Sequence, residues 1–131
     1  MKERASRLKA AYLAASPLIE AYTALFCPGC ERVCCIDRHG THEAEDLAFL
    51  DALGTAGPPE PPRARDTLPC RHLTARGCAV ERWMRPYRCT WYFCERLLLG
   101  IAESEPRAYR DLLLALSALH SARREFMEGL G

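Results

Sequence analysis

Apolar side chains recur at helical spacing along the first 26 residues of the chain. Their positions advance in alternating steps of four and three, which places them on one face of a helix over residues 2–26. Within this segment Pro17 lacks a backbone N–H and clashes with the preceding turn, so Ser16 and Pro17 predict a kink or a new helix start. The stripe consists of Leu8, Tyr12, Ala15, Ile19, Tyr22 and Phe26.

A second long stripe lies near the other end of the chain. The predicted helix begins around residues 104–106 and continues to about residue 128. Because the two stripes match, we expect the flanking helices, residues 2–26 and 105–128, to pack together and close a helical domain. The second stripe consists of Tyr109, Leu112, Leu116, Leu119 and Phe126, widened by Leu113 and Met127.

Two shorter helices are predicted between the long ones. Residues 43–53 form the first, with Thr41 as its candidate cap, acidic residues in its first turn and Gly54 as its stop. Residues 54–66 hold four prolines and predict a surface loop, because the chain on either side is too short to fold alone.

The second short helix begins near Thr90 and runs to Ala102, with Gly100 weakening its end. Strand signals are nearly absent. We therefore expect a mainly α fold, one domain over residues 1–131, in which irregular cysteine-rich loops join the helices.

Eight cysteines gather in two windows that interrupt the helical pattern. Eight thiolates make two sets of four, the number that a closed zinc site or a cubane iron–sulfur cluster requires. The cysteine-cluster core therefore spans residues 27–94, and all eight cysteines are candidate metal ligands. The first window holds Cys27, Cys30, Cys34 and Cys35, and the second holds Cys70, Cys78, Cys89 and Cys94.

Whether the cysteines bind metal or form disulfides depends on the cellular compartment of the protein. The longest uncharged run near the start, residues 10–19, is broken by Pro17 and followed by Glu20, so it is a poor secretion leader. No apolar run approaches the roughly 20 residues needed to span a bilayer. We expect a cytoplasmic protein without a membrane partner, where such spacing favours metal over disulfides or free thiols, the two alternatives.

Charge excludes little by itself. The chain has 18 lysines and arginines against 17 acidic residues, without the basic bias that a nucleic-acid partner would leave. Arginines near Cys89 are either a solvated face or the surface of an adaptor for another protein or nucleic acid. No Ser-His-Asp set, phosphate loop or carboxylate pair predicts catalysis, so the sequence leaves open whether the chain is an enzyme.

The first window has the stronger chemical signal. Cys27 and Cys30 flank Pro28-Gly29, which favours a tight turn that lets two thiolates hold one ion. A redox dithiol is the alternative, but that motif usually follows a strand. Side chains of Cys34 and Cys35 point in different directions, which predicts different metals or different cluster corners. Alternatively, one of the pair is a buried small hydrophobe.

In the second window Cys94 falls in the first turns of the helix predicted from Thr90, where the helix dipole favours a thiolate. Loops or turns are expected to carry Cys70, Cys78 and Cys89. Nearby arginines could offset the negative charge of the thiolates: Arg85, Arg88 and Arg96.

The histidines are weaker candidates. His39, His42 and His72 lie close to cysteines and could each replace one in a mixed site, or could be surface residues. His120 is expected on the surface of the last helix.

Taken together, the order Cys-x-x-Cys-x-x-x-Cys-Cys, a distant Cys-x-x-Leu, a further cysteine and Arg-Pro-Tyr-Arg-Cys resembles the YkgJ family of cysteine-cluster proteins. That resemblance covers about residues 27–94 and implies chelation of zinc or iron, without supplying a reaction. It departs from the family at Cys70-Arg-His-Leu73, usually Cys-Pro-Phe-Leu, and at Val80-Glu81, usually Ile-Tyr. The step from Cys78 to Arg85 is also one residue longer. The matching positions are Cys27, Cys30, Cys34, Cys35, Cys70, Leu73, Cys78, Arg85, Pro86 and Cys89, with Cys94 as the eighth cysteine.

The sequence thus predicts a small metal-binding protein whose thiolates hold zinc or iron and whose folding is coupled to the metal. An iron–sulfur redox protein, or an accessory component of an enzyme, is the alternative. The cysteine order of radical S-adenosylmethionine enzymes is absent, because the spacing of the first window runs the other way.

Overall fold

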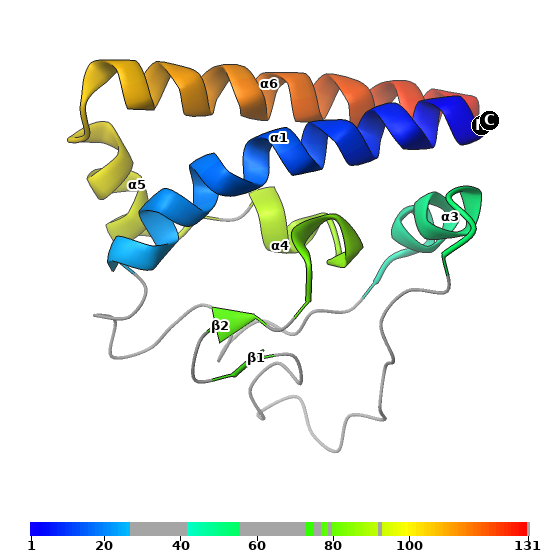
Figure 1. Ribbon diagram of the computed structural model, residues 1–131, viewed down its shortest axis with the longest axis horizontal. Coiled ribbons are helices and arrows are strands. Elements are labelled where there is room, and N and C mark those ends of the chain that lie inside the picture. The colour runs from blue at the N-terminus through cyan, green and yellow to red at the C-terminus, as the bar shows by residue number, and fades with distance from the viewer. Residues whose placement is uncertain (27–41, 56–72, 75–76, 79, 92, 131) are drawn as a thin grey trace.

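The computed structural model describes residues 1–26, 42–55, 73–74, 77–78, 80–91 and 93–130. Helices dominate this part of the chain, as predicted, and they are arranged around the antiparallel pair α1 and α6 (Figure 1). The elements are α1 (Lys2–Phe26), α3 (Ala44–Ala52), β1 (Leu73–Thr74), β2 (Gly77–Cys78), the 3-10 helix η2 (Arg82–Met84), α4 (Arg88–Trp91), α5 (Glu95–Ala102) and α6 (Pro106–Gly129).

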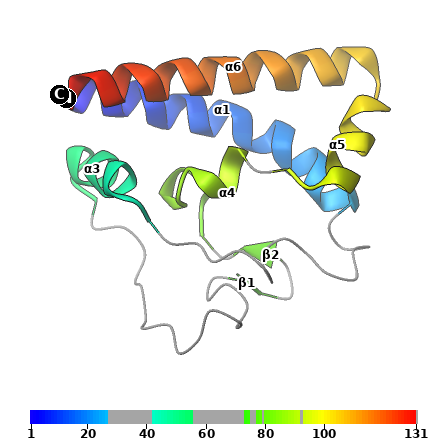
Figure 2. The same ribbon diagram turned by 180° about the vertical axis from the view of Figure 1, so that it is seen from behind.

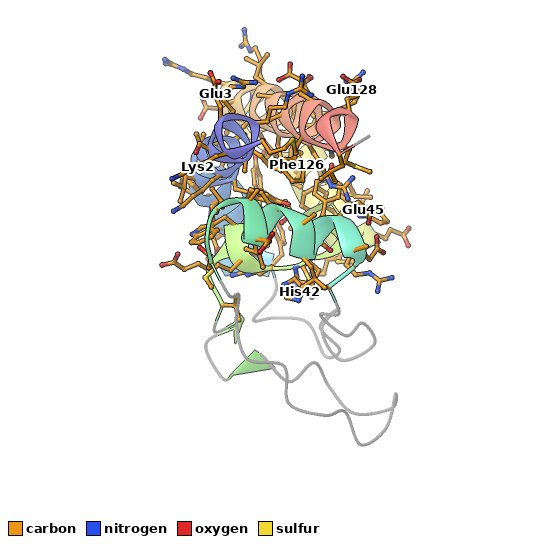
Figure 3. The ribbon with its side chains drawn as sticks, turned by 90° about the vertical axis from the view of Figure 1, so that its right-hand side faces the viewer. Lys2, Glu3, His42, Glu45, Phe126 and Glu128 are labelled. Atoms are coloured by element: carbon orange, nitrogen blue, oxygen red, sulfur yellow. The ribbon has the colours of Figure 1, made fainter. Side chains whose placement is uncertain are left out.

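Packing of α1 against α6 confirms the predicted closure of the domain by its terminal helices. Leu8 of α1 and both Leu119 and Phe126 of α6 are at most 2% exposed. Phe126 points into the space enclosed by α1, α3 and α6 (Figure 3). The apolar stripes are therefore the central part of the core, because they remove two continuous helix faces from water.

The predicted stripe of α6 is too wide at its N-terminal end. Tyr109 is 37% exposed and Leu113 is 47% exposed, whereas the neighbouring Leu112 is buried. Figures 1 and 2 show why: the C-terminal half of α1 diverges from α6, and α5 lies at that end instead. Only one row of α6 side chains is covered there.

Helix α1 runs through Pro17 as one element, so the expected new start at Ser16 is wrong. Pro17 lies on the exposed face of the helix, where the carbonyl that loses its N–H partner can bind water. The Ser16 hydroxyl caps no helix and instead accepts a hydrogen bond from Arg82 Nε at 3.2 Å.

Helix α3 is present where a helix was predicted, but its cap differs. Glu43 is its N-cap residue, and the Glu43 N–H donates to Asp46 Oδ2 at 2.9 Å. Thr41, the expected cap, lies outside the described residues. Gly54 follows the helix with φ of +74°, the left-handed conformation that ends helices and favours glycine.

The aromatic core links α3 to both long helices. The Phe49 ring of α3 lies 5.8 Å from Tyr12 of α1 and 5.8 Å from Phe126 of α6, centroid to centroid. The Phe49–Phe126 rings meet edge to face at 78°, the arrangement that aromatic quadrupoles favour. Leu50 is also buried.

The helix predicted from Thr90 to Ala102 is two helices. Helix α4 ends at Trp91, and Cys94 is the N-cap residue of α5, with extended backbone at φ −70° and ψ 165°. Thr90 therefore lies inside α4 rather than at a helix start. Each helix buries its own side chains, Thr90 from α4 and both Leu97 and Ile101 from α5.

Strands β1 and β2 were not predicted. They pair antiparallel, with Leu73 opposite Cys78 and Thr74 opposite Gly77. Two residues per strand are too few for an alternating apolar pattern to show in the sequence. Among the described residues, no helix combines the length and apolarity that crossing a membrane would need.

Candidate metal centre

Three of the eight candidate cysteine ligands lie on described elements. Cys78 ends strand β2, Cys89 is an exposed residue of α4, and Cys94 is a half-buried residue at the start of α5. The expectation that Cys78 and Cys89 lie in loops is therefore wrong. Outside the described residues are Cys27, Cys30, Cys34, Cys35 and Cys70, together with His39 and His72.

Cys94 lies at the positive end of a helix, as predicted, but it occupies a different position in a different helix. It does not lie in the first turns of a helix begun at Thr90. It lies at the N-cap position of α5, whose first N–H groups have no partner within the helix.

Cys89 lies close to the core of the long helices. Burial raises the pKa of Tyr12 on α1, and the charges of Asp46 and, more weakly, Cys89 raise it further. Cys89 of α4 is thus near enough to Tyr12 of α1 for its charge to affect the tyrosine. Among the described residues alone, no group of three histidine, cysteine or acidic side chains is close enough to hold a metal ion.

The chain enters the first cysteine window from a residue that packs on α5. Phe26 ends α1, and its ring lies so close to Gly100 that a Cβ added there would be 2.3 Å from Phe26 Cζ. The contact with Phe26 explains why position 100 is glycine. From the sequence alone, Gly100 indicated only that the end of the helix is weak. Gly100 lies six residues after Cys94, or about 9 Å along α5 at 1.5 Å per residue.

The chain leaves the first window at residues that contact the segment just before Cys89. His42 Nε2 donates to the Met84 carbonyl at 2.8 Å. His42 lies beside the start of α3 (Figure 3). A ring N–H bound to a backbone carbonyl is also how metal-ligating histidines are commonly oriented.

Asp46 makes the second connection at this end. Its Oδ1 accepts the Tyr87 N–H at 3.0 Å while its Oδ2 accepts the Glu43 N–H, and the residue is only 7% exposed. Sequence interpretation assigned the acidic run to helix N-terminal charge and missed this role. A glutamate followed three residues later by an aspartate departs from the usual capping-box pattern, so the sequence signal was weak.

The second window is also attached to α1. The Arg82 guanidinium is buried, donates to Ser16 and pairs with Glu20 Oε1 at 3.0 Å, while Arg85 Nη2 lies 3.7 Å from the same carboxylate. Arg85 Nε also donates to the Val80 carbonyl at 2.7 Å. Arg85 is one of the arginines expected to offset the thiolate charge. Its guanidinium interacts with the Glu20 carboxylate of α1.

Both ends of residues 27–41 are consequently fixed against residues 84–100. One end is Phe26 on Gly100, and the other is the pair of contacts from His42 and Asp46. Helices α3 and α4 and the β1–β2 pair all lie on one side of the layer formed by α1 and α6 (Figures 1 and 3). The residues that flank positions 27–41 thus contact residues 84–100 at two separate places, Phe26 at the α5 end of α1 and His42 and Asp46 towards the α3 end (Figure 1).

Comparison of the chain with protein-family models, with curated proteins and with solved structures finds no match.

Proposed function

We propose that the chain is a cysteine-cluster protein of the YkgJ type that binds zinc or iron through thiolates drawn from both windows. The observation that supports this proposal is the attachment of both ends of residues 27–41 to residues 84–100. Contacts of this kind join the residues that flank the first window to residues 84–100, which include Cys89 and Cys94, and this supports a metal shared by both windows. A reducing cytoplasm is the compartment in which such thiols remain available to a metal.

The donor chemistry fits a thiophilic metal. Thiolates select zinc and iron–sulfur clusters over magnesium or calcium. Among the described cysteines, Cys94 is half-buried at the start of α5 and Cys89 is exposed on α4. Metal bound across the windows would add to the contacts of Phe26, His42 and Asp46, so folding and binding are coupled.

Elemental analysis of protein purified without oxygen tests this function directly. We expect zinc or iron in stoichiometric amount. A colourless protein with zinc supports a structural site, and a brown protein with iron and sulfide supports the redox alternative. Protein that folds with neither metal contradicts the proposal.

Chelation provides the second test, because a structural zinc site contributes on the order of 10–16 kcal/mol to folding. Both tryptophans, Trp83 and Trp91, belong to the second window, so tryptophan fluorescence reports on that window and on its contact with α1. Trp83 stacks under Lys9 Nζ at 4.1 Å and donates to Glu81 Oε2. We expect chelation at neutral pH to change this fluorescence and lower the melting temperature, and added metal to restore both. Unchanged melting after complete metal removal would contradict the coupling.

A further inference from the structure

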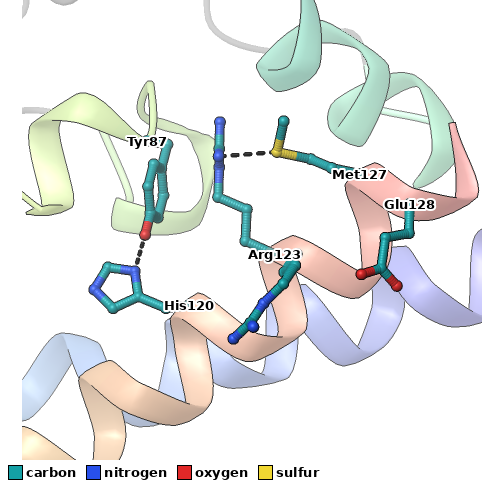
Figure 4. Close-up of a pocket in the computed structure, with 6 residues that line it drawn as sticks. Tyr87, His120, Arg123, Met127 and Glu128 are labelled. Atoms are coloured by element: carbon teal, nitrogen blue, oxygen red, sulfur yellow. Dashed lines mark hydrogen bonds between the residues drawn. The ribbon is translucent and has the colours of Figure 1, made fainter. Parts of the chain in front are cut away.

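A depression of about 430 Å³ lies between α6 and the segment that precedes α4, and the cysteine windows do not account for it. Figure 4 shows Tyr87 facing His120 and Arg123 across it. Its lining residues are Tyr87, His120, Arg123, Arg124, Met127 and Glu128. This lining combines three nitrogen-bearing side chains of one helix with an aromatic ring from another segment.

Helix geometry groups the nitrogen donors. His120, Arg123 and Arg124 are related by steps of three and four residues, so both arginines are neighbours of His120 on the surface of α6. They lie at least five residues before Gly129, outside the last turn, where the negative end of the helix dipole would oppose an anion.

Tyr87 orients Arg123. The guanidinium carbon lies 4.0 Å from the centroid of the Tyr87 ring, and Arg123 Nη1 donates to Met127 Sδ at 3.0 Å. Both partners are uncharged. Within the described part of the chain no carboxylate pairs with Arg123 or Arg124, so the charge of a stacked, half-buried guanidinium is not neutralised.

Tyr87 also contacts His120. The Tyr87 hydroxyl and His120 Nδ1 form a hydrogen bond, and the two rings meet edge to face at 83°. Burial lowers the pKa of His120 and the Arg123 charge lowers it further. His120 therefore adds a polar ring without a charge to the lining of the depression.

We propose that this depression binds a single phosphate group, as inorganic phosphate or as the terminal phosphate of a small phosphate monoester. A guanidinium group can donate two parallel hydrogen bonds to two oxygens of one phosphate. When its flat face stacks on an aromatic ring, the N–H groups along its edge can still donate. Glu128 is the one acidic lining residue, and it lies on the opposite side of Arg123 from His120 (Figure 4). The phosphate site is therefore the His120 side of Arg123.

Two guanidinium groups favour a phosphate over a carboxylate, which has one charge and two oxygens. The depression is open, so binding is weak, with a dissociation constant on the order of 1 mM. This assignment does not depend on the metal function, because none of the lining residues is a candidate metal ligand.

Titration of the full chain, as purified, with inorganic phosphate at constant ionic strength tests the site. The His120 ring resonances should shift and saturate. Arg124→Gln should weaken binding by about tenfold, because it removes one charge-assisted donor from an exposed side chain with little structural role. Arg110→Gln, an exposed arginine of the same helix that does not line the depression, is the matched control and should bind like the unmodified chain.

Arg123→Lys keeps the charge but loses the stacked fork, and it should also weaken binding while the Arg110 control does not. Tighter binding of phenyl phosphate than of inorganic phosphate would identify a monoester as the ligand, and equal binding would identify the phosphate group alone. The proposal is overturned by shifts that do not saturate, or by equal weakening in the Arg110 and Arg124 variants, which would indicate general charge screening.

Discussion

At the scale of single residues, Asp46 has the largest structural role of any charged side chain in α3. One buried carboxylate accepts N–H groups from Glu43 at the start of its own helix and from Tyr87, 41 positions further along the chain. Those two donors belong to the two segments that border the cysteine windows. Removing the carboxylate leaves both partly buried N–H groups without this acceptor, and the free-energy cost then includes their desolvation as well as the lost hydrogen bonds.

We expect Asp46→Ala to lower the free energy of unfolding by about 2–4 kcal/mol, measured by urea denaturation. Asp51→Ala on the same helix is the control, because Asp51 is exposed and should change stability by less than about 0.5 kcal/mol. Equal effects at the two positions would show that the contact with Tyr87 contributes nothing to stability.

The proposed ligand role of Cys94 can be separated by substitution from its position at the start of α5. The Cys94 side chain makes no cap hydrogen bond there. Serine removes the sulfur and supplies a hydroxyl that can cap the helix, whereas alanine removes the sulfur and supplies no cap. We expect Cys94→Ser and Cys94→Ala to lose the same amount of bound metal, measured as metal per chain. In metal-free protein the serine variant should be more stable than the alanine variant by about 1 kcal/mol. Full metal content in both variants would remove Cys94 from the ligand set.

At the scale of elements, the contact of α1 with α5 depends on a missing side chain. Gly100 has no Cβ, and the Phe26 ring occupies the space where one would be, with three ring carbons within 2.8 Å of the added atom. Glycine inside a helix otherwise costs roughly 0.5–1 kcal/mol relative to alanine. The cost is offset by the close approach of the last residue of α1.

A double-mutant cycle tests this contact. Gly100→Ala should destabilise the protein by about 1–3 kcal/mol, because the ring or the helix must move. In the Phe26→Ala background the same change should instead stabilise α5 by about 0.5 kcal/mol, since the space is then open. Urea denaturation of the four proteins measures both steps. Destabilisation of the same size in both backgrounds would contradict the contact.

The break between α4 and α5 shows why helix patterns can mislead at this scale. Thr90, Leu97 and Ile101 are buried at spacings of seven and four, the spacing of one continuous helix face. No glycine or proline marks the break. The sequence therefore predicted one helix, whereas the structure ends α4 at Trp91 and begins a new helix with Cys94 as its cap.

At the scale of the whole molecule, the long helices and their pairing could be predicted because each has a regular apolar stripe, which is a local property of the sequence. Contacts between distant segments could not be predicted in this way. His42 with Met84 and Asp46 with Tyr87 join residues about 40 positions apart through single hydrogen bonds. The cysteines were identifiable as candidate ligands from their number and spacing, and which of them share an ion remains a prediction.

The antiparallel pairing of α1 with α6 has a consequence for the rate of folding. These helices form the main core, yet residues 27–105 separate them, so the core can form only after a long loop has closed. Loop closure is slowed by its entropy, and high sequence separation of contacts slows folding across small proteins. A metal held between the two cysteine windows would divide this loop into shorter ones. Refolding from urea, followed by stopped-flow, should therefore be faster with metal bound than without it.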